Sequence, residues 1–92
     1  MTFKDTEYGD LTGKVYDGTI TLNNVGLTSL EGAPKEVTGA FCVPNNKLKS
    51  LEHCPTKIRG ALWCEGNLIG PEDFKREIVK YKILASNYIN GD

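Results

Sequence analysis

The sequence predicts an α/β fold in which a short repeating unit builds a solenoid. The solenoid has a small parallel sheet of about three strands and a capping helix at its C-terminal side. Three observations predict it. The chain of 92 residues matches itself when shifted by 21 positions. Each unit holds apolar residues two apart, the spacing of a strand with one buried face. An amphipathic helical pattern follows the last unit.

The composition indicates one folded domain over residues 1–92. Leu, Ile, Val and Phe supply one quarter of the chain, above the roughly 20% below which disorder is expected. Eleven basic and twelve acidic residues give a net charge of −1, so no basic excess is available for a nucleic-acid backbone or an anionic membrane. The longest apolar run, Ala61 to Cys64, is too short to span a bilayer.

About two and a half repeats occupy residues 16–69, after an N-terminal cap or antiparallel strand in residues 1–15. A unit of 21 residues is too short for a strand, a full helix and two connections. We therefore expect one short strand and a compact return loop per unit, closed by a proline. The shift places these residues in register: Leu27 with Leu48, Leu30 with Leu51, Pro34 with Pro55, Val37 with Ile58, Gly39 with Gly60, Phe41 with Leu62 and Asn46 with Asn67.

Two places in the first unit depart from this pattern. Asp17-Gly18 is also a hairpin signal, although the glycine falls in register with the glycines of the later units, which favours the repeat. Val25 stands where the later units carry asparagine, and Asn24, one place earlier, is the candidate to replace the missing side chain.

The repeat has a recognisable consensus. The stretch Phe41-Cys42-Val43-Pro44-Asn45-Asn46-Lys47-Leu48 with Leu51 reads LxLxxNxLxxL, and Leu62 to Ile69 repeats LxCxxNxI. This pattern resembles the leucine-rich repeat, in its short bacterial form of about twenty to twenty-two residues. The stretch from Leu27 to Gly39 is similar to repeats in small proteins of large tailed bacteriophages. The resemblance covers a little over half the chain and implies a parallel strand stack, an asparagine ladder, protein binding and no catalytic residue.

Residues 70–92 are predicted to form a helix and a tail. Pro71 suits the first helical position, and the acids after it favour the helix N-terminus. We expect the helix to end near Ser86 and to cover the end of the solenoid. Val79 and Ile83 lie beside its apolar face, where contact with a partner is the alternative. That face consists of Phe74, Ile78, Tyr81, Ala85 and Tyr88.

The outward face of the strands is the predicted binding surface. Stacking at 21-residue intervals brings Thr21, Cys42 and Trp63 into one row. Tryptophan is strongly enriched among binding hot spots, and Trp63 is the only one in the chain. The alternative is that Trp63 folds against the C-terminal helix. The predicted partner-binding residues are Thr19, Thr21, Cys42, Arg59, Trp63 and Glu65.

The return loops carry a mild basic character from Lys47, Lys49 and Lys57. We interpret these side chains as a solvated loop face. Docking of an acidic protein surface on them is the alternative.

Neither catalysis nor metal binding is expected. Cys42, Cys54 and Cys64 fall in three different environments of the repeat, whereas structural zinc needs four converging ligands. His53, the only histidine, belongs to a return loop, away from the outward Cys42, so a Cys–His nucleophile pair is not expected. No phosphate-binding glycine motif occurs. We therefore expect no enzymatic activity, cofactor or metal.

The predicted function is that of a non-enzymatic protein-binding module. The phage resemblance suggests a small accessory protein that binds a bacterial host protein and inhibits or redirects it. Three cysteines without a CxxC pair, and no leader-like pattern at the start, lead us to expect the host cytoplasm. The alternative is a structural or self-associating protein, a homodimer formed through an open strand edge near residues 16–22 or through the helix. Nucleic-acid binding is the weakest hypothesis, and no membrane association is expected.

Overall fold

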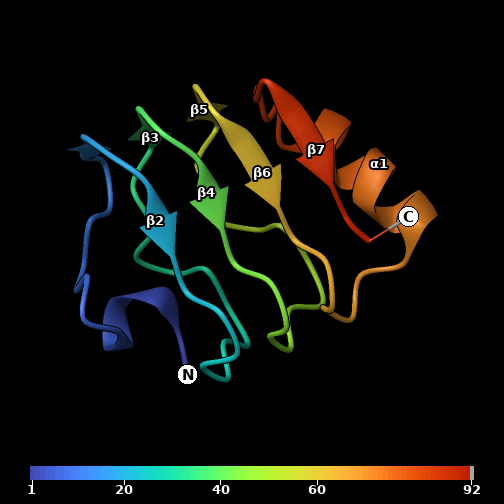
Figure 1. Ribbon diagram of the computed structural model, residues 1–92, viewed down its shortest axis with the longest axis horizontal. Helices are drawn as coiled ribbons and strands as arrows, with labels where there is room; N and C mark the ends of the chain where they lie inside the picture. The colour runs from blue at the N-terminus through green and yellow to red at the C-terminus, as the bar shows by residue number, and fades with distance from the viewer. Residues whose placement is uncertain (92) are drawn as a thin grey trace.

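The computed structural model describes residues 1–91, which hold seven strands, one α-helix and one turn of 3-10 helix. Figure 1 shows the strands side by side across the molecule, with the N-terminal turn at one end and the α-helix at the other. Neither helix of the described residues has the length and apolar character needed to cross a bilayer. The elements are η1 (Phe3–Asp5), β1 (Val15–Tyr16), β2 (Ile20–Thr21), β3 (Glu36–Val37), β4 (Phe41–Cys42), β5 (Lys57–Ile58), β6 (Ala61–Trp63), α1 (Pro71–Lys80) and β7 (Asn87–Ile89).

The strands form two parallel sheets, in the orders β1-β3-β5 and β2-β4-β6-β7. Pairing within the repeats follows the 21-residue shift. In the second sheet Ile20 pairs with Phe41, and Phe41 pairs with Leu62. In the first sheet Val15 pairs with Glu36 in the same offset. Residues one repeat apart therefore lie side by side on neighbouring strands.

The prediction of about three strands is wrong, because the described residues hold seven strands in two sheets. Each repeat contributes two strands, separated by a turn at Gly18, Gly39 or Gly60. The first strand of each repeat has no apolar residues two apart around it, so the sequence does not mark it as a strand. The hairpin at Asp17-Gly18 does not form, since β1 and β2 pair in parallel with β3 and β4 and not with each other.

The turns stack backbone against backbone, which requires glycine. A Cβ atom on Gly39 would lie 2.7 Å from the carbonyl oxygen of Gly18 in the preceding repeat. A Cβ atom on Gly60 would lie 2.9 Å from the backbone nitrogen of Ala40. The glycines that recur in the sequence thus set the close approach of successive repeats.

The core lies between the second sheet and the return loops. Phe41 and Leu62 are fully buried at paired positions, and Phe74 of α1 belongs to the same cluster. The predicted inward face of the strands is buried throughout, and the leucines of the return loops pack beneath it. The buried strand-face and loop residues are Ile20, Leu22, Phe41, Val43, Leu62 and Cys64 with Leu27, Leu30, Leu48 and Leu51.

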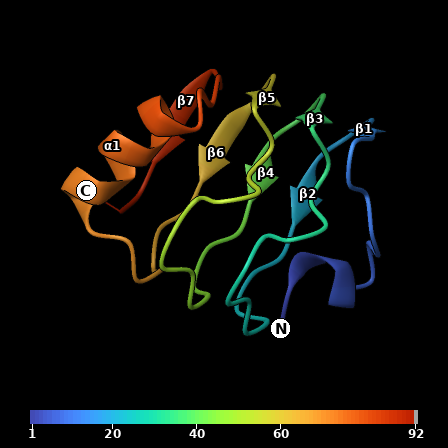
Figure 2. The same ribbon diagram turned by 180° about the vertical axis from the view of Figure 1, so that it is seen from behind.

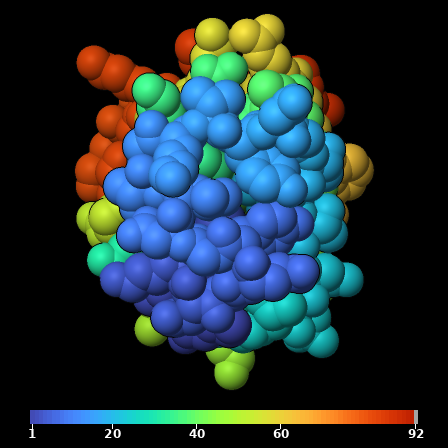
Figure 3. Space-filling model, turned by 90° about the vertical axis from the view of Figure 1, so that its left-hand side faces the viewer, coloured from blue at the N-terminus to red at the C-terminus, as the bar shows by residue number. Residues whose placement is uncertain are grey.

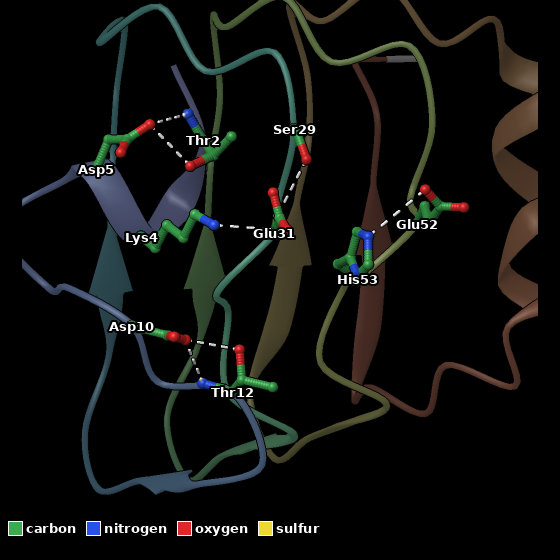
Figure 4. A network of polar contacts seen from close by, with 9 residues as sticks. All are labelled: Thr2, Lys4, Asp5, Asp10, Thr12, Ser29, Glu31, Glu52 and His53. Atoms are coloured by element: carbon green, nitrogen blue, oxygen red, sulfur yellow. Dashed lines mark hydrogen bonds and ion pairs between the residues drawn. The ribbon is translucent and has the colours of Figure 1, made fainter.

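Residues 1–14 cover the first end of the stack, which Figure 3 views end-on with the N-terminal segment in the darkest blue. Phe3 is fully buried, and its ring centroid lies 6.2 Å from that of Phe41 and 5.8 Å from that of Tyr8. Lys4 donates its backbone N–H to the Glu31 carbonyl at 2.9 Å and forms an ion pair with the Glu31 side chain at 3.6 Å (Figure 4).

The C-terminal segment begins as predicted and then departs from the prediction. Helix α1 starts at Pro71 but ends at Lys80, well before the predicted end near Ser86. Lys82 has a φ of 55°, a left-handed conformation that cannot continue the helix. The chain then turns back as β7, which pairs in parallel with β6, so Tyr88 lies in a strand and not on the helix. In Figure 2, seen from behind, α1 lies in front of this last strand.

Candidate functional site

The predicted outward row forms on the second sheet. Thr21 pairs with Cys42, and Cys42 pairs with Trp63, so the three side chains lie on adjacent strands. The row has a fourth member that the 21-residue spacing does not predict, since Trp63 pairs with Ile89 of β7. We call these four residues the strand-face row. Ile89 was missed because β7 does not follow the 21-residue spacing.

Trp63 is the large side chain of the strand-face row. It is 38% exposed, whereas its chain neighbours Leu62 and Cys64 are fully buried. Because side chains alternate along a strand, Trp63 points away from the core. Helix α1 inserts Phe74 into that core, on the other side of the sheet. Trp63 therefore belongs to the surface and does not fold against the helix.

The other predicted site residues lie at the margins of the row. Thr19 precedes β2, is exposed, and accepts a hydrogen bond from the Ala40 N–H at 3.2 Å. Arg59 lies in the turn between β5 and β6, where its Nε stands 3.4 Å from a Glu36 carboxylate oxygen. Glu65 follows β6 and is half-buried. The structure thus gathers Thr21, Cys42 and Trp63 and places Thr19, Arg59 and Glu65 around them.

The charges at these margins are unequal. Glu36 neutralises Arg59, so little free positive charge remains at that margin. At the other margin one carboxylate oxygen of Glu65 is buried without a hydrogen-bond partner among the described residues. The surface around Trp63 accordingly has one paired guanidinium group at one margin and one carboxylate at the other.

Asparagine side chains fix the strand ends that present the row. Asn46 is buried, and its Oδ1 accepts the N–H groups of Val25 at 3.0 Å and Leu27 at 3.1 Å in the preceding repeat. Asn67 repeats the arrangement by accepting the Leu48 N–H at 3.0 Å. Asn24 does not replace the missing asparagine, because it adopts the left-handed turn conformation that Asn45 repeats, with φ of 55° and 58°.

Two of the three thiols, Cys54 and Cys64, are buried in the core, so they share an environment that the repeat predicts to differ. Cys64 is fully buried, and burial raises its pKa to about 12. Burial also raises the pKa of Cys54 well above its ordinary value. Cys42 is half-buried, and burial and then the Glu65 carboxylate raise its pKa, against a hydrogen bond from Thr21. All three are protonated at neutral pH, so none is an activated nucleophile.

The remaining candidate catalytic and metal-binding residues lie apart from Cys42. His53 sits in a return loop beside Glu52, with 3.5 Å between its Nε2 and the carboxylate (Figure 4). It is not among the groups that shift the pKa of Cys42. Residues 1–91 contain no cluster of three or more His, Cys, Asp or Glu side chains placed to hold a metal ion.

The basic residues of the repeats divide between the two sides of the molecule. Lys47 and Lys49 are exposed in the return loop after β4. Lys57 belongs to β5, in the first sheet. None of the three takes part in an ion pair of the described residues. They do not converge on the strand-face row.

Comparison of the chain with protein-family models, curated proteins and solved structures finds no match.

Proposed function

We propose that this chain is a short leucine-rich-repeat solenoid that acts as a non-enzymatic protein-binding module. The parallel pairing at 21-residue offsets supports the solenoid, as does the repeated bonding of Asn46 and Asn67 to the preceding repeat. The raised thiol pKa values and the position of His53 support a role without catalysis.

The strand-face row is the observation on which the binding role depends. Trp63 stands between Cys42 and Ile89 on adjacent strands, and the paired backbone holds all three in fixed positions. A partly exposed tryptophan flanked by neutral side chains is the kind of anchor that dominates protein interfaces. Its partner on this account presents an apolar side chain to the row and polar groups to Thr19 and Glu65.

The partner is, in this proposal, a bacterial host protein that a small phage protein inhibits or redirects in the host cytoplasm. The similarity of residues 27–39 to phage repeats supports this assignment. Free thiols at Cys42, Cys54 and Cys64 suit a reducing compartment.

Self-association through the edges of the second sheet is less favoured. The backbone N–H of Thr21, at the outer edge of β2, donates to the Tyr8 hydroxyl at 3.2 Å. At the other edge of this sheet the N–H of Tyr88 donates to Oδ1 of Asn87 at 2.9 Å. Because side chains already occupy these edge donors, a second copy has to displace them before its strand can pair.

The test is affinity capture from bacterial lysate with wild-type protein and two variants. Trp63→Ala removes the anchor, and Leu68→Ala is the matched control, because Leu68 is a 60%-exposed apolar residue outside the row. We expect wild type and Leu68→Ala to retain one host protein and Trp63→Ala to lose it, with all three folded by circular dichroism. Equal capture by all three proteins contradicts the proposed surface. Capture of nothing by a protein that sediments as a dimer contradicts the host-binding role.

A further inference from the structure

A concave surface lies at the C-terminal end, on the opposite face of β7 from Ile89 of the strand-face row. It is a hollow of about 430 Å³ between α1 and β7, which lie side by side in Figures 1 and 2. Helix residues form one wall and strand residues the other. The lining residues are Pro71, Phe74, Lys75, Ile78, Tyr88 and Asn90.

The walls of the hollow are mostly apolar. Phe74 is buried at the base, and Ile78 is half-buried beside it. The Tyr88 hydroxyl donates to the Ile83 carbonyl at 2.8 Å and accepts the Ala85 N–H at 3.0 Å. Because these internal bonds occupy the phenol oxygen, Tyr88 offers its ring to the hollow. An occupant therefore needs an apolar body.

The hollow does not suit an added strand. The outer N–H of β7 is that of Tyr88, and Asn87 already accepts it at 2.9 Å. A peptide that binds by strand addition relies on main-chain hydrogen bonds of this kind. An occupant that buries an apolar group without needing backbone donors suits the site better.

Among residues 1–91, Lys75 supplies the one charged side chain that lines the hollow, through its ammonium group. Lys75 is exposed, and it takes part in none of the ion pairs of residues 1–91. The nearby helix pair joins Arg76 to Asp73 at 2.8 Å and leaves Lys75 out. A positive charge thus stands at the mouth of an apolar hollow, which favours an anion at that position.

We propose that this hollow binds a small amphipathic carboxylate, with its aromatic or aliphatic body against Phe74, Ile78 and Tyr88 and its carboxylate against Lys75. Pockets for small ligands are commonly about 300 to 1,000 Å³ and mostly apolar, with a few placed polar groups. A volume near 430 Å³ suits a single ring with a short acid chain. The occupant is a free small molecule, and its site is independent of the strand-face row.

The probes are 3-phenylpropionate and its uncharged analogue 3-phenylpropanol, titrated into the full 15N-labelled chain and followed by two-dimensional NMR. We expect saturable chemical-shift changes at the amides of Ile78 and Tyr88, with dissociation constants in the millimolar range. The acid should bind more tightly than the alcohol. Lys75→Gln is expected to weaken binding of the acid about fivefold to tenfold, to the level of the alcohol. Lys80→Gln is the charge-matched control on the same helix, outside the hollow, and should leave both affinities unchanged.

A second pair of variants tests the apolar wall. Ile78→Ala should weaken both probes, and Val79→Ala should weaken neither, because Val79 is 77% exposed and does not line the hollow. The proposal is overturned if the acid and alcohol bind equally, if Lys80→Gln matches Lys75→Gln, or if the shifts map elsewhere. Shifts of the same residues with protein concentration alone, without any probe, also overturn it, since a second copy is then the occupant.

Discussion

The side-chain amide of Asn46 donates to the Leu22 carbonyl of the preceding repeat at 2.8 Å. Its oxygen accepts the Val25 and Leu27 N–H groups, so one buried side chain joins two return loops. Asn46→Ala leaves these groups unsatisfied and should lower the free energy of unfolding by about 3 kcal/mol. Urea unfolding measures the change, and the exposed Asn23→Ala is the control, with less than about 0.5 kcal/mol expected. Equal effects of the two changes contradict the ladder as a stabilising element.

Gly32 and His53 occupy equivalent positions of successive repeats, with φ of 99° and 70°. A Cβ atom on Gly32 would lie 2.9 Å from the backbone nitrogen of Lys4, so Gly32→Ala should lower the free energy of unfolding by about 2 kcal/mol. His53→Gly removes the strain of a non-glycine residue in the left-handed conformation. It should leave the free energy of unfolding unchanged or raise it by up to about 1 kcal/mol. Thermal unfolding of the two variants compares them. A greater loss of stability in His53→Gly than in Gly32→Ala would contradict the interpretation that this turn position favours glycine.

Glu77 anchors α1 to the second return loop, because its Oε1 accepts the backbone N–H of Leu51. A carboxylate that accepts a partly buried N–H contributes about 1.5 to 3 kcal/mol. We expect Glu77→Ala to lower the free energy of unfolding by about 2 kcal/mol and Glu77→Gln to recover part of that loss. Glu72→Ala, on the exposed first turn, is the matched control and should stay within about 0.5 kcal/mol of wild type. Hydrogen exchange at the Leu51 amide gives a local readout, which should speed up in Glu77→Ala alone.

The buried Cys64 thiol predicts a loss of stability in alkali. Burial raises its pKa from 9.0 to about 12, so above pH 9 the unfolded chain loses a proton that the folded protein retains. The contribution is fully present below the unfolded pKa and falls as pH rises toward the folded pKa, by at most about 1.4 kcal/mol per pH unit. Cys64→Val, the residue type at position 43 of the preceding repeat, removes this group. Above about pH 9 the free energy of unfolding of wild type should fall steadily relative to that of Cys64→Val. If the two proteins show parallel dependence on pH, the raised pKa of Cys64 is contradicted.

The same environments predict the order of thiol reactivity. Cys54 and Cys64 are buried, whereas Cys42 is half-buried on the strand face. Alkylation of the native protein near neutral pH should modify Cys42 first and slowly, and mass spectrometry of the digest identifies the site. Modification of Cys54 or Cys64 at a rate equal to that of Cys42 in the folded protein would be inconsistent with the core described here.

The repeat made much of the second sheet predictable. A shift of 21 positions aligned Ile20, Phe41 and Leu62, and those residues pair in the structure. The first sheet was not predicted, because its segments lack apolar residues two apart, and Glu36–Val37 buries Val37 alone. The row Thr21, Cys42 and Trp63 followed from the same shift.

The C-terminal departures have a local cause. Tyr88 pairs with Leu62 at a separation of 26 residues, because α1 takes the place of a return loop. Its helical spacing from Phe74 and Ile78 made it look like part of the helix face. The sequence does not predict the left-handed conformation of Lys82, because lysine rarely adopts it. The missed strand β7 is what adds Ile89 to the strand-face row.

The most direct test of the strand-face role is site-specific photo-crosslinking in bacterial lysate. A benzophenone amino acid that replaces Thr21 lies in the row beside Cys42. The same probe in place of Lys49 lies in a return loop. The account predicts that Thr21 crosslinks to one host protein, that Trp63→Ala abolishes this product, and that Lys49 yields none. A host protein crosslinked from Lys49 and insensitive to Trp63→Ala would contradict it and place the interface on the basic return loops.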